Sequence, residues 1–257
     1  MVCAHKSGLG MSATINAPAK LTISLRVTGI RSDGFHLIDA EMVTLDLCDT
    51  LTIAEAEKSS LSVSGPFAKG VPADSSNLCL AATKFAQRPA SIHLEKNIPH
   101  GGGLGGGSAD AAAVLRWAGI SNAASTVTLG ADVPFCLRGG RARITGIGEN
   151  IEPLPHLDLT FTLVAPPLHV STLAVYRTWD ELGGPTGEGL NDLEPAALHV
   201  EPKLKWWREQ IMSLTGTVPA LAGSGSTWFV EGERDDALVE LIGEGAVVHV
   251  ARTRKAM

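Results

Sequence analysis

A run of glycines in the middle of the chain is the segment whose residue types could do the most specific chemistry. Residues 101–107 are six glycines around Leu104, and residues 91–95 before them alternate between polar and apolar like a strand. Ser108 is suited to cap a helix after the run, and Asp110 would fall in its first turn. Glycine-rich backbone at a helix N-terminus presents N–H groups to an anion. The strand, loop and helix order therefore predicts a phosphate site.

Three other interpretations of this run fit less well. No Lys-Ser or Lys-Thr pair follows the glycines, which excludes a Walker A loop. A dinucleotide-binding loop would lie near the first strand, with an acid at a strand end about 20 residues on. This loop lies in mid-chain, and Asp132 stands within a Gly-Ala-Asp-Val-Pro turn. A flexible linker would not lead into a helix with such regular apolar residues.

Composition indicates a globular protein that does not bind nucleic acid as its main partner. The chain has 257 residues, of which 44% are hydrophobic and 5% aromatic, so the core must consist mainly of Leu, Val, Ile and Ala. This length suits one large domain or two ordinary ones. The net charge is −6, without the clustered Lys and Arg that a phosphate backbone requires. An anionic ligand would be held by backbone dipoles and a few placed cations.

The cysteines and the chain start bear on compartment and processing. The four cysteines stand far apart without a CxxC pair, and the histidines show no ligand spacing, so no zinc or redox motif is expected. Scattered thiols favour a reducing cytoplasm, and Cys79 and Cys136 are expected in the core. No run approaches the roughly 18 apolar residues of a membrane span. Residues 1–14 lack a signal-peptide core and are expected to form a disordered tail.

The alternation and turn signals predict an α+β fold of two domains that lie side by side. A turn is expected at residues 31–34, a helix with Asn or Ser near its cap at 76–85, and a domain boundary near residue 155. The domains would then span residues 15–155 and 156–257. Strands are expected at residues 21–27, 41–47, 49–55, 61–64, 141–145, 159–165, 227–231 and 246–252. Further helices are expected at residues 171–182, 203–214 and 235–242.

Three segments together resemble the GHMP kinases, which include galactokinases, homoserine kinases and mevalonate kinases. They are residues 16–21, the glycine run and residues 221–226. Within that superfamily the chain resembles the branch that acts on 4-diphosphocytidyl-2-C-methyl-D-erythritol. The segments that carry the closer resemblance are residues 17–21, 33–36, 98–112, 129–135 and 146–149, in that order. The likeness runs from about residue 16 to the C-terminus.

The resemblance implies a two-domain GHMP kinase fold, with a ferredoxin-like C-terminal domain and the active site in the cleft between the domains. It implies ATP-dependent phosphorylation of the substrate's 2-hydroxyl, which gives the 2-phosphate and ADP, in the non-mevalonate isoprenoid pathway. The implied cofactors are ATP and Mg²⁺, and the implied partners are ATP and a cytidine diphosphate-linked methylerythritol. A cytoplasmic monomer or weak homodimer without nucleic acid or membrane partners is expected.

The resemblance also assigns the catalytic pair. Asp132 matches the catalytic aspartate, which would accept the proton of the attacking hydroxyl. Lys20 would lie beside it, keep it ionised and help place that hydroxyl. On the residues alone, Asp132 could instead cap the turn before Pro134, and Lys20 could be a solvated edge charge.

The glycine run would surround the phosphates of ATP through backbone N–H groups. Ser108 would also contact Mg²⁺, and Asp110 would either complete the metal shell or only favour the helix dipole. The residues expected to bind ATP are Pro99, His100, Gly101, Gly102, Gly103, Leu104, Gly105, Gly106, Gly107 and Ser108.

The substrate site is expected to hold the cytosine between aromatic rings. Phe35 and His36 would stack on the base and bind its polar edge, and Tyr176, the only tyrosine, would lie on the other side. Tyr176 could instead be a half-buried helix residue. Gly223, Ser224 and Gly225 would form a turn near the acceptor or the phosphates, or else an ordinary tight turn before a strand.

The chain departs from the family at a few positions. Thr22, in the acceptor site, stands where Asn is usual, Phe35 where Tyr is common, and Gly102 where many relatives have Ala. The interval between Asp110 and Gly130 is shorter than usual.

Two other functions compete: another GHMP kinase, such as a homoserine or mevalonate kinase, and a nucleotide sensor without catalysis. The cytidine-branch motifs disfavour the first, and the intact Lys20 and Asp132 disfavour the second.

Overall fold

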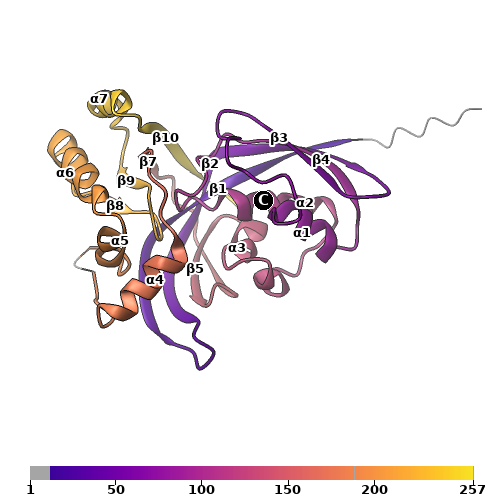
Figure 1. Ribbon diagram of the computed structural model, residues 1–257, viewed down its shortest axis with the longest axis horizontal. Helices are drawn as coiled ribbons and strands as arrows, with labels where there is room; N and C mark the ends of the chain where they lie inside the picture. Colours follow the sequence, from indigo (N-terminus) through magenta and orange to yellow (C-terminus); the bar gives the residue numbers. More distant parts are fainter. Residues whose placement is uncertain (1–11, 188, 257) are drawn as a thin grey trace, which may run out of the picture.

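Two long antiparallel strands run through the whole molecule (Figure 1). The computed structural model describes residues 12–187 and 189–256. β1 (Ala13–Ile30) and β2 (His36–Glu55) pair from end to end around the predicted turn at residues 31–34. The three strands predicted for this region are parts of these two, because shifts in register bend the strands without ending them. Most of the predicted tail lies outside the described residues, and its residues 13 and 14 belong to β1.

The other strands extend this hairpin into one ten-stranded sheet, whose main order is β3-β4-β2-β10-β7-β9-β8. β1 pairs with β2, and β5 pairs with both β2 and β6. All the predicted strands are confirmed, apart from small differences at their ends, and β6 and β8 are additions. The bounds are β3 Ser60–Ser64, β4 Ala90–Glu95, β5 Arg141–Gly146, β6 Asn150–Leu154, β7 Thr160–Ala165, β8 Ala220–Leu221, β9 Trp228–Glu231 and β10 Val247–Arg254.

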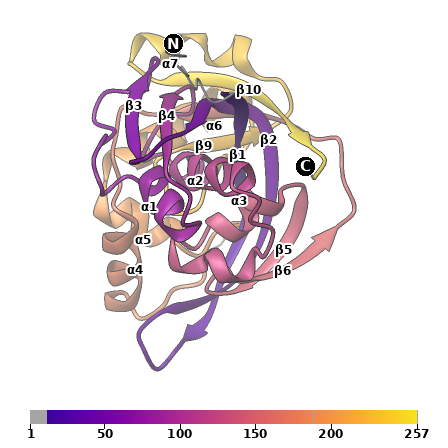
Figure 2. The ribbon, with the colours of Figure 1, turned by 90° about the vertical axis from the view of Figure 1, so that its right-hand side faces the viewer.

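The helices form two groups. In one, α1 (Leu78–Phe85), α2 (Gly106–Trp117) and α3 (Val133–Arg138) pack on the sheet near β1, β2 and β4 (Figure 2). The predicted cap of α1 is confirmed, since the Asn77 side chain accepts a hydrogen bond from the N–H of Cys79. The α2 face in this core is mainly alanine, which lets the helix lie close to the strands.

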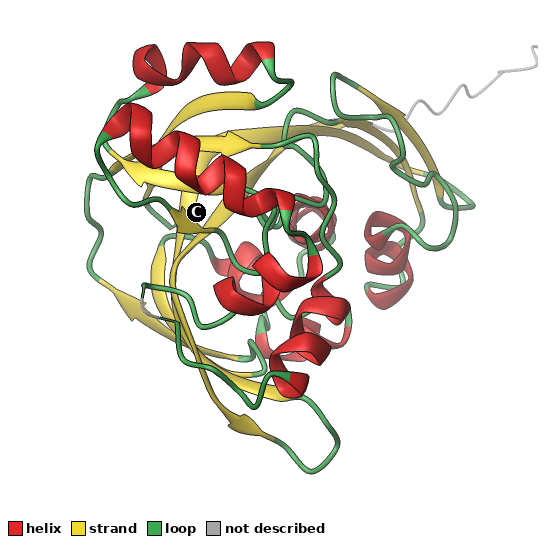
Figure 3. Cartoon of the chain, turned by 60° about the vertical axis from the view of Figure 1, so that its left-hand side comes forward, coloured by secondary structure: helices red, strands yellow, loops and turns green. Residues whose placement is uncertain are grey.

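The second group covers the sheet near β7 and β9 (Figure 3). It consists of α4 (Thr172–Glu181), α5 (Glu194–Val200), α6 (Lys203–Thr215) and α7 (Val239–Gly243), with a 3₁₀ turn at residues 235–238 before α7. A second 3₁₀ turn, at residues 124–128, lies beside α3 in the first group. The helices predicted at residues 171–182 and 203–214 are confirmed, the one predicted at 235–242 is a 3₁₀ turn followed by α7, and α5 is an addition. The core of the second group holds the buried rings of Trp207 and Trp228. Within the described ranges, no helix has the length and apolar character needed to cross a membrane.

The last strand joins the two halves. β10 pairs with β7 along residues 247–252 and then with β2 at residues 253 and 254. The expected boundary at residue 155 falls in the connection between β6 and β7. The two halves therefore share one sheet, and a third core lies between them, where Ile98 and Leu104 pack with Phe161 and Phe229.

Candidate active site

The glycine run forms a loop between a strand and a helix, as the sequence predicts. β4 ends at Glu95 and α2 begins at Gly106. The prediction that Ser108 caps the helix is wrong, because the helix begins earlier and Gly105, with φ of 67°, occupies the N-cap position without a side-chain bond. Since no side chain caps the first turn of α2, its backbone N–H groups are available for a ligand.

A second glycine turn packs directly on this loop. A Cβ atom on Gly103, whose φ is 80°, would collide with the carbonyl oxygen of Ala222. The N–H of Thr227 donates to the carbonyl of Gly102 at 3.2 Å. The predicted turn at residues 223–225 therefore lies against the phosphate loop, and only glycine permits the approach at residue 103.

Two cavities meet at this contact. One, of about 370 Å³, is lined by all ten residues predicted to bind ATP. The other, of about 740 Å³, is lined by six of the seven predicted substrate residues, Thr22, Phe35, His36, Tyr176, Gly223 and Ser224. Gly103, Asp132 and Thr172 line both cavities. A group transferred from a ligand in one cavity to a ligand in the other would pass these three residues.

Asp132 and Lys20 form an ion pair at the junction. The Nζ atom of Lys20 lies 3.3 Å from Oδ2 of Asp132 and donates to Oγ1 of Thr22 at 3.0 Å. Lys20 is only 4% exposed, and its stem lies against Gly105 of the loop, where a Cβ would collide with it. It is therefore no solvated edge charge. Asp132 begins α3 without capping it, so its carboxylate stays available, with 30% of the side chain exposed.

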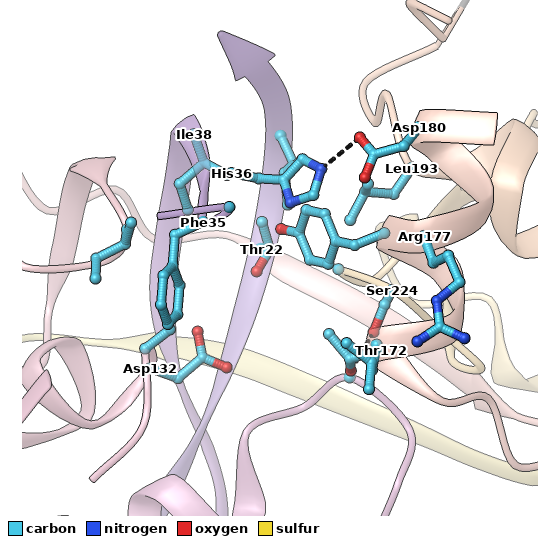
Figure 4. A pocket seen from close by; sticks show the side chains of 18 of the residues that line it. Thr22, Phe35, His36, Ile38, Asp132, Thr172, Arg177, Asp180, Leu193 and Ser224 are labelled. Atoms are coloured by element: carbon cyan, nitrogen blue, oxygen red, sulfur yellow. Dashed lines mark hydrogen bonds and ion pairs between the residues drawn. The ribbon is translucent and has the colours of Figure 1, made fainter. Parts of the chain in front are cut away.

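The aromatic end of the larger cavity is built by the β1–β2 turn and α4 (Figure 4). Nε2 of His36 lies 2.7 Å from Oδ1 of Asp180, and the imidazole packs on Tyr176 with ring centroids 4.7 Å apart. Trp179 meets the same imidazole edge-on at 5.6 Å. Burial raises the pKa of Tyr176, so its phenol stays protonated. The ring of Phe35 is 56% exposed and is free to stack on a ligand.

The turn at residues 223–225 is held by groups that the sequence analysis missed. Nδ2 of Asn191, which is 2% exposed, donates to the carbonyls of Leu221 and Gly223 at 2.8 and 2.6 Å. Ser224 shares a 2.8 Å hydrogen bond with Thr172 at the start of α4. Gly225 supports the turn without lining either cavity. Asn191 lies in a Gly-rich stretch whose local pattern predicts only a loop.

A buried ion cluster beneath the phosphate loop was also missed. Nζ of Lys96 contacts Oδ2 of Asp49 and, at 2.8 Å, Oδ2 of Asp110. The other oxygen of Asp49 accepts from the N–H groups of Asn97 and Ile98 at 2.6 and 2.8 Å. The prediction that Asp110 sits in the first turn and favours the helix dipole is thus wrong, because α2 begins at Gly106 and Asp110 lies beyond its first turn, with its carboxylate buried against Lys96. The cluster ties β2, the start of the loop and α2 together.

One lysine serves two carboxylates in this cluster, and the pKa values of Asp110 and Lys96 are both shifted. The pKa of Asp110 is raised to about 8, first by burial and then by the charge of Asp49, while Lys96 opposes the shift. Burial alone would lower the pKa of Lys96, but the charges of Asp110 and Asp49 raise it above its usual value. Burial in the cluster therefore favours the protonated form of Asp110 more than an exposed position would.

The donors for a divalent cation beside the phosphate loop are few. Within the described part of the chain, no group of three or more His, Cys, Asp or Glu side chains could hold a metal ion. Ser108 and Asp110 line the phosphate cavity, and Oδ1 of Asp110 is buried without a hydrogen-bond partner. Such a set fits Mg²⁺ held mainly by phosphate oxygens and water, with one or two protein oxygens.

The expected buried thiols Cys79 and Cys136 are confirmed.

Comparisons with known proteins agree with this geometry. Residues 77–140, which include the phosphate loop and Asp132, match the GHMP kinases N terminal domain. A solved 4-(cytidine 5'-diphospho)-2C-methyl-D-erythritol kinase superposes with a TM-score of 0.72 at 30% identity, covering 94% of this chain and 98% of that one. A homoserine kinase from Cytophaga hutchinsonii has a TM-score of 0.63 at 15% identity, which shows the shared fold alone.

Curated relatives are similar over most of their length. A 4-diphosphocytidyl-2-C-methyl-D-erythritol kinase of Paracoccus denitrificans is 42% identical over 232 residues, which cover 83% of this chain and 84% of the relative. A kinase of the same name from Ruegeria pomeroyi is 36% identical over 240 residues, with coverage of 83% and 86%. At this identity and coverage, the chain belongs to the 4-diphosphocytidyl-2-C-methyl-D-erythritol kinase family of GHMP kinases.

Proposed function

We propose that this kinase transfers the γ-phosphoryl group of ATP to the 2-hydroxyl of 4-diphosphocytidyl-2-C-methyl-D-erythritol, with Asp132 as the base. The products are the 2-phosphate and ADP, and the reaction is a step of the non-mevalonate isoprenoid pathway. One observation carries the assignment of the base: Asp132 lines both cavities at their junction. A proton acceptor must reach the acceptor hydroxyl while that hydroxyl faces the γ-phosphate.

In this mechanism the carboxylate of Asp132 accepts the proton of the 2-hydroxyl as the oxygen attacks the γ-phosphorus. The bond from the γ-phosphorus to the bridging oxygen breaks, and ADP leaves with that electron pair. Lys20 orients the carboxylate from 3.3 Å. Thr22, which accepts a hydrogen bond from Lys20 at 3.0 Å, positions the ammonium, so it supports the pair in place of the usual Asn.

ATP binds in the smaller cavity through the glycine loop. Backbone N–H groups of residues 101–108 bind the phosphates, and the uncapped start of α2 adds its dipole. Ser108 and Oδ1 of Asp110, which has no hydrogen-bond partner, would be the protein donors that hold Mg²⁺, and a bound Mg²⁺ would supply positive charge against the phosphates. Because the transition state of phosphoryl transfer is loose, positioning and charge stabilisation supply most of the rate.

The cytidine end of the substrate binds between Phe35 and the surface formed by His36 and Tyr176. The exposed ring of Phe35 offers a stacking face, and the ring nitrogen of His36 that does not face Asp180 is free for the polar edge of the base. Gly223 and Ser224 line the part of the cavity nearer the phosphates.

The same site bears on the two competing functions, on the oligomeric state and on the compartment. A nucleotide sensor has no use for the Lys20 and Asp132 pair, and the homoserine and mevalonate kinase neighbours share the fold alone. Both cavities are lined by one chain, which suits a monomer or weak homodimer. The described free thiols suit a reducing cytoplasm.

We place the domain boundary at residue 155, between β6 and β7, with a ferredoxin-like unit after it.

The test is ADP release from ATP, Mg²⁺ and the cytidine substrate, with wild type compared with Asp132→Asn. Loss of the base should reduce kcat by about 10²- to 10⁴-fold while ATP still binds. Turnover that survives in Asp132→Asn would limit Asp132 to positioning. A wild type that binds ATP without turning over this substrate would contradict the proposed function.

A further inference from the structure

The charged side chains that line the acceptor cavity are paired, except one. Lys20 pairs with Asp132, and His36 pairs with Asp180. The remaining acid, Asp33, is held by Arg31, which lies beside the cavity in the same turn, at 2.6 Å. Arg177 also lines the cavity, and among the described residues no carboxylate lies within ion-pair distance of its guanidinium. Arg177 is therefore the one cationic side chain lining this cavity that has no acidic partner among the described residues.

Arg177 lies between the two ends of the site. It follows Tyr176 on α4, so its Cα is next to the aromatic end, and Figure 4 shows its guanidinium beside Thr172 and Ser224, on the opposite side of the cavity from Asp132. Thr172 lines both cavities. A ligand that reaches from the aromatic rings to Asp132 would thus pass the free guanidinium midway.

We propose that Arg177 binds the diphosphate of the acceptor substrate. The inference rests on the proposed function, in which a diphosphate joins the cytidine to the methylerythritol unit. That diphosphate must lie between the base and the reacting hydroxyl, and its negative charge matches the one unpaired cation of the cavity. A guanidinium also presents a planar fork of donors that fits phosphate oxygens, unlike the point charge of a lysine.

Neutral groups near Arg177 would complete the diphosphate site. The hydroxyls of Thr172 and Ser224 form a mutual 2.8 Å hydrogen bond, in which one hydroxyl donates and the other remains free to donate to a phosphate oxygen. These groups bind a phosphate without supplying charge. The guanidinium therefore accounts for the charge recognition, and Arg177 selects a nucleoside diphosphate handle over an uncharged one.

The test measures binding without catalysis. Cytidine 5′-diphosphate and cytidine are titrated by calorimetry into wild type, Arg177→Gln, Arg177→Lys and Arg234→Gln, with ADP saturating the ATP cavity. Arg234 is an exposed arginine that lines neither cavity and serves as the matched control. Arg177→Gln should weaken cytidine 5′-diphosphate about tenfold to hundredfold and leave cytidine unchanged. Arg177→Lys should fall between, and Arg234→Gln should match wild type.

Three results would overturn the inference. They are an Arg177→Gln variant that binds cytidine 5′-diphosphate as tightly as wild type, an equal loss for both ligands, and a wild type that does not prefer the diphosphate to cytidine. Unchanged cytidine affinity in Arg177→Gln shows that the variant is folded. Failure of the proposed function is separate: wild type would bind cytidine 5′-diphosphate through Arg177 yet release no ADP with the full substrate. With the full substrate, Arg177→Gln should raise KM more than it lowers kcat.

Discussion

Replacing Lys96 with methionine should strongly destabilise the protein, because it removes the only cation of a buried cluster. Lys96 contacts Asp49, which is 0% exposed, and Asp110, which is 3% exposed. Methionine fills a similar volume with an apolar chain, so the change removes charge more than packing. Without the ammonium, two buried carboxylates face each other without a counterion.

The magnitude follows from what each carboxylate can do without Lys96. Breaking a buried ion pair by removing one partner costs about 3–5 kcal/mol. Asp110, whose pKa is already raised to about 8, can stay protonated at pH 7. Asp49 keeps its bonds from the N–H groups of Asn97 and Ile98, which stabilise its charge. The loss should therefore lie near the lower end, at about 3 kcal/mol.

Equilibrium unfolding in urea at pH 7, followed by circular dichroism, measures this loss. Lys205→Met is a matched control on the surface, where Lys205 is 72% exposed and pairs only with Glu209 at 3.9 Å, and it should change stability by less than about 0.5 kcal/mol. If the free energy of unfolding of Lys96→Met were within about 1 kcal/mol of wild type, the buried contacts of Lys96 would stabilise the protein no more than a surface ion pair does. That result would refute the stabilising role assigned to the buried cluster.

Two further predictions concern the same loop and helix. Asp110→Asn should flatten the pH dependence of stability: the folded carboxyl, with a pKa of about 8, holds a proton that the unfolded one, near 3.8, has lost, so the stability contribution of Asp110 falls as pH rises between these values. Urea unfolding at pH 5 and 8 should show the variant gaining on wild type at the higher pH, and a constant difference would contradict this. Gly103→Ala should weaken ATP binding and cost more than about 1–3 kcal/mol, since it adds a collision with Ala222 to the strain of a φ of 80°. Gly119→Ala, with a φ of 81° and open space around it, isolates the strain, and equal losses in the two variants would exclude the collision.

The features that the sequence predicts are those set by neighbouring residues. Alternation predicts the strand at residues 91–95, and the glycines predict the loop after it. The start of α2 could not be predicted in this way, because Gly106 disfavours a helix by local propensity. Gly106 lies close to the buried cluster, where a Cβ would be 3.1 Å from Nζ of Lys96. Helix propensity does not describe such a contact. Local propensity alone therefore does not locate this helix boundary.

The roles of single residues were predictable only where the family supplied them. Lys20 and Asp132 are far apart in sequence, and their pairing came from the resemblance. The Lys96 cluster joins residues from β2, β4's end and α2, and no local pattern joins these. One signal was present: Asp110 stands among alanines that face the core, and a carboxylate on a buried helix face needs a partner. That signal predicts a buried cation without naming it.

The position of β10 has a consequence for how the enzyme folds during synthesis. This strand comes from residues 247–254, yet it bridges β2 from the start of the chain and β7 from its middle. Until these residues have been made, β7 has no hydrogen-bonding neighbour on its β10 side, and β2 lacks its β10 partner at Thr44 and Leu45. An unpaired strand edge invites association with other chains. The continuous sheet that joins the two halves, between which the two cavities meet, is therefore completed only once residues 247–254 have been made.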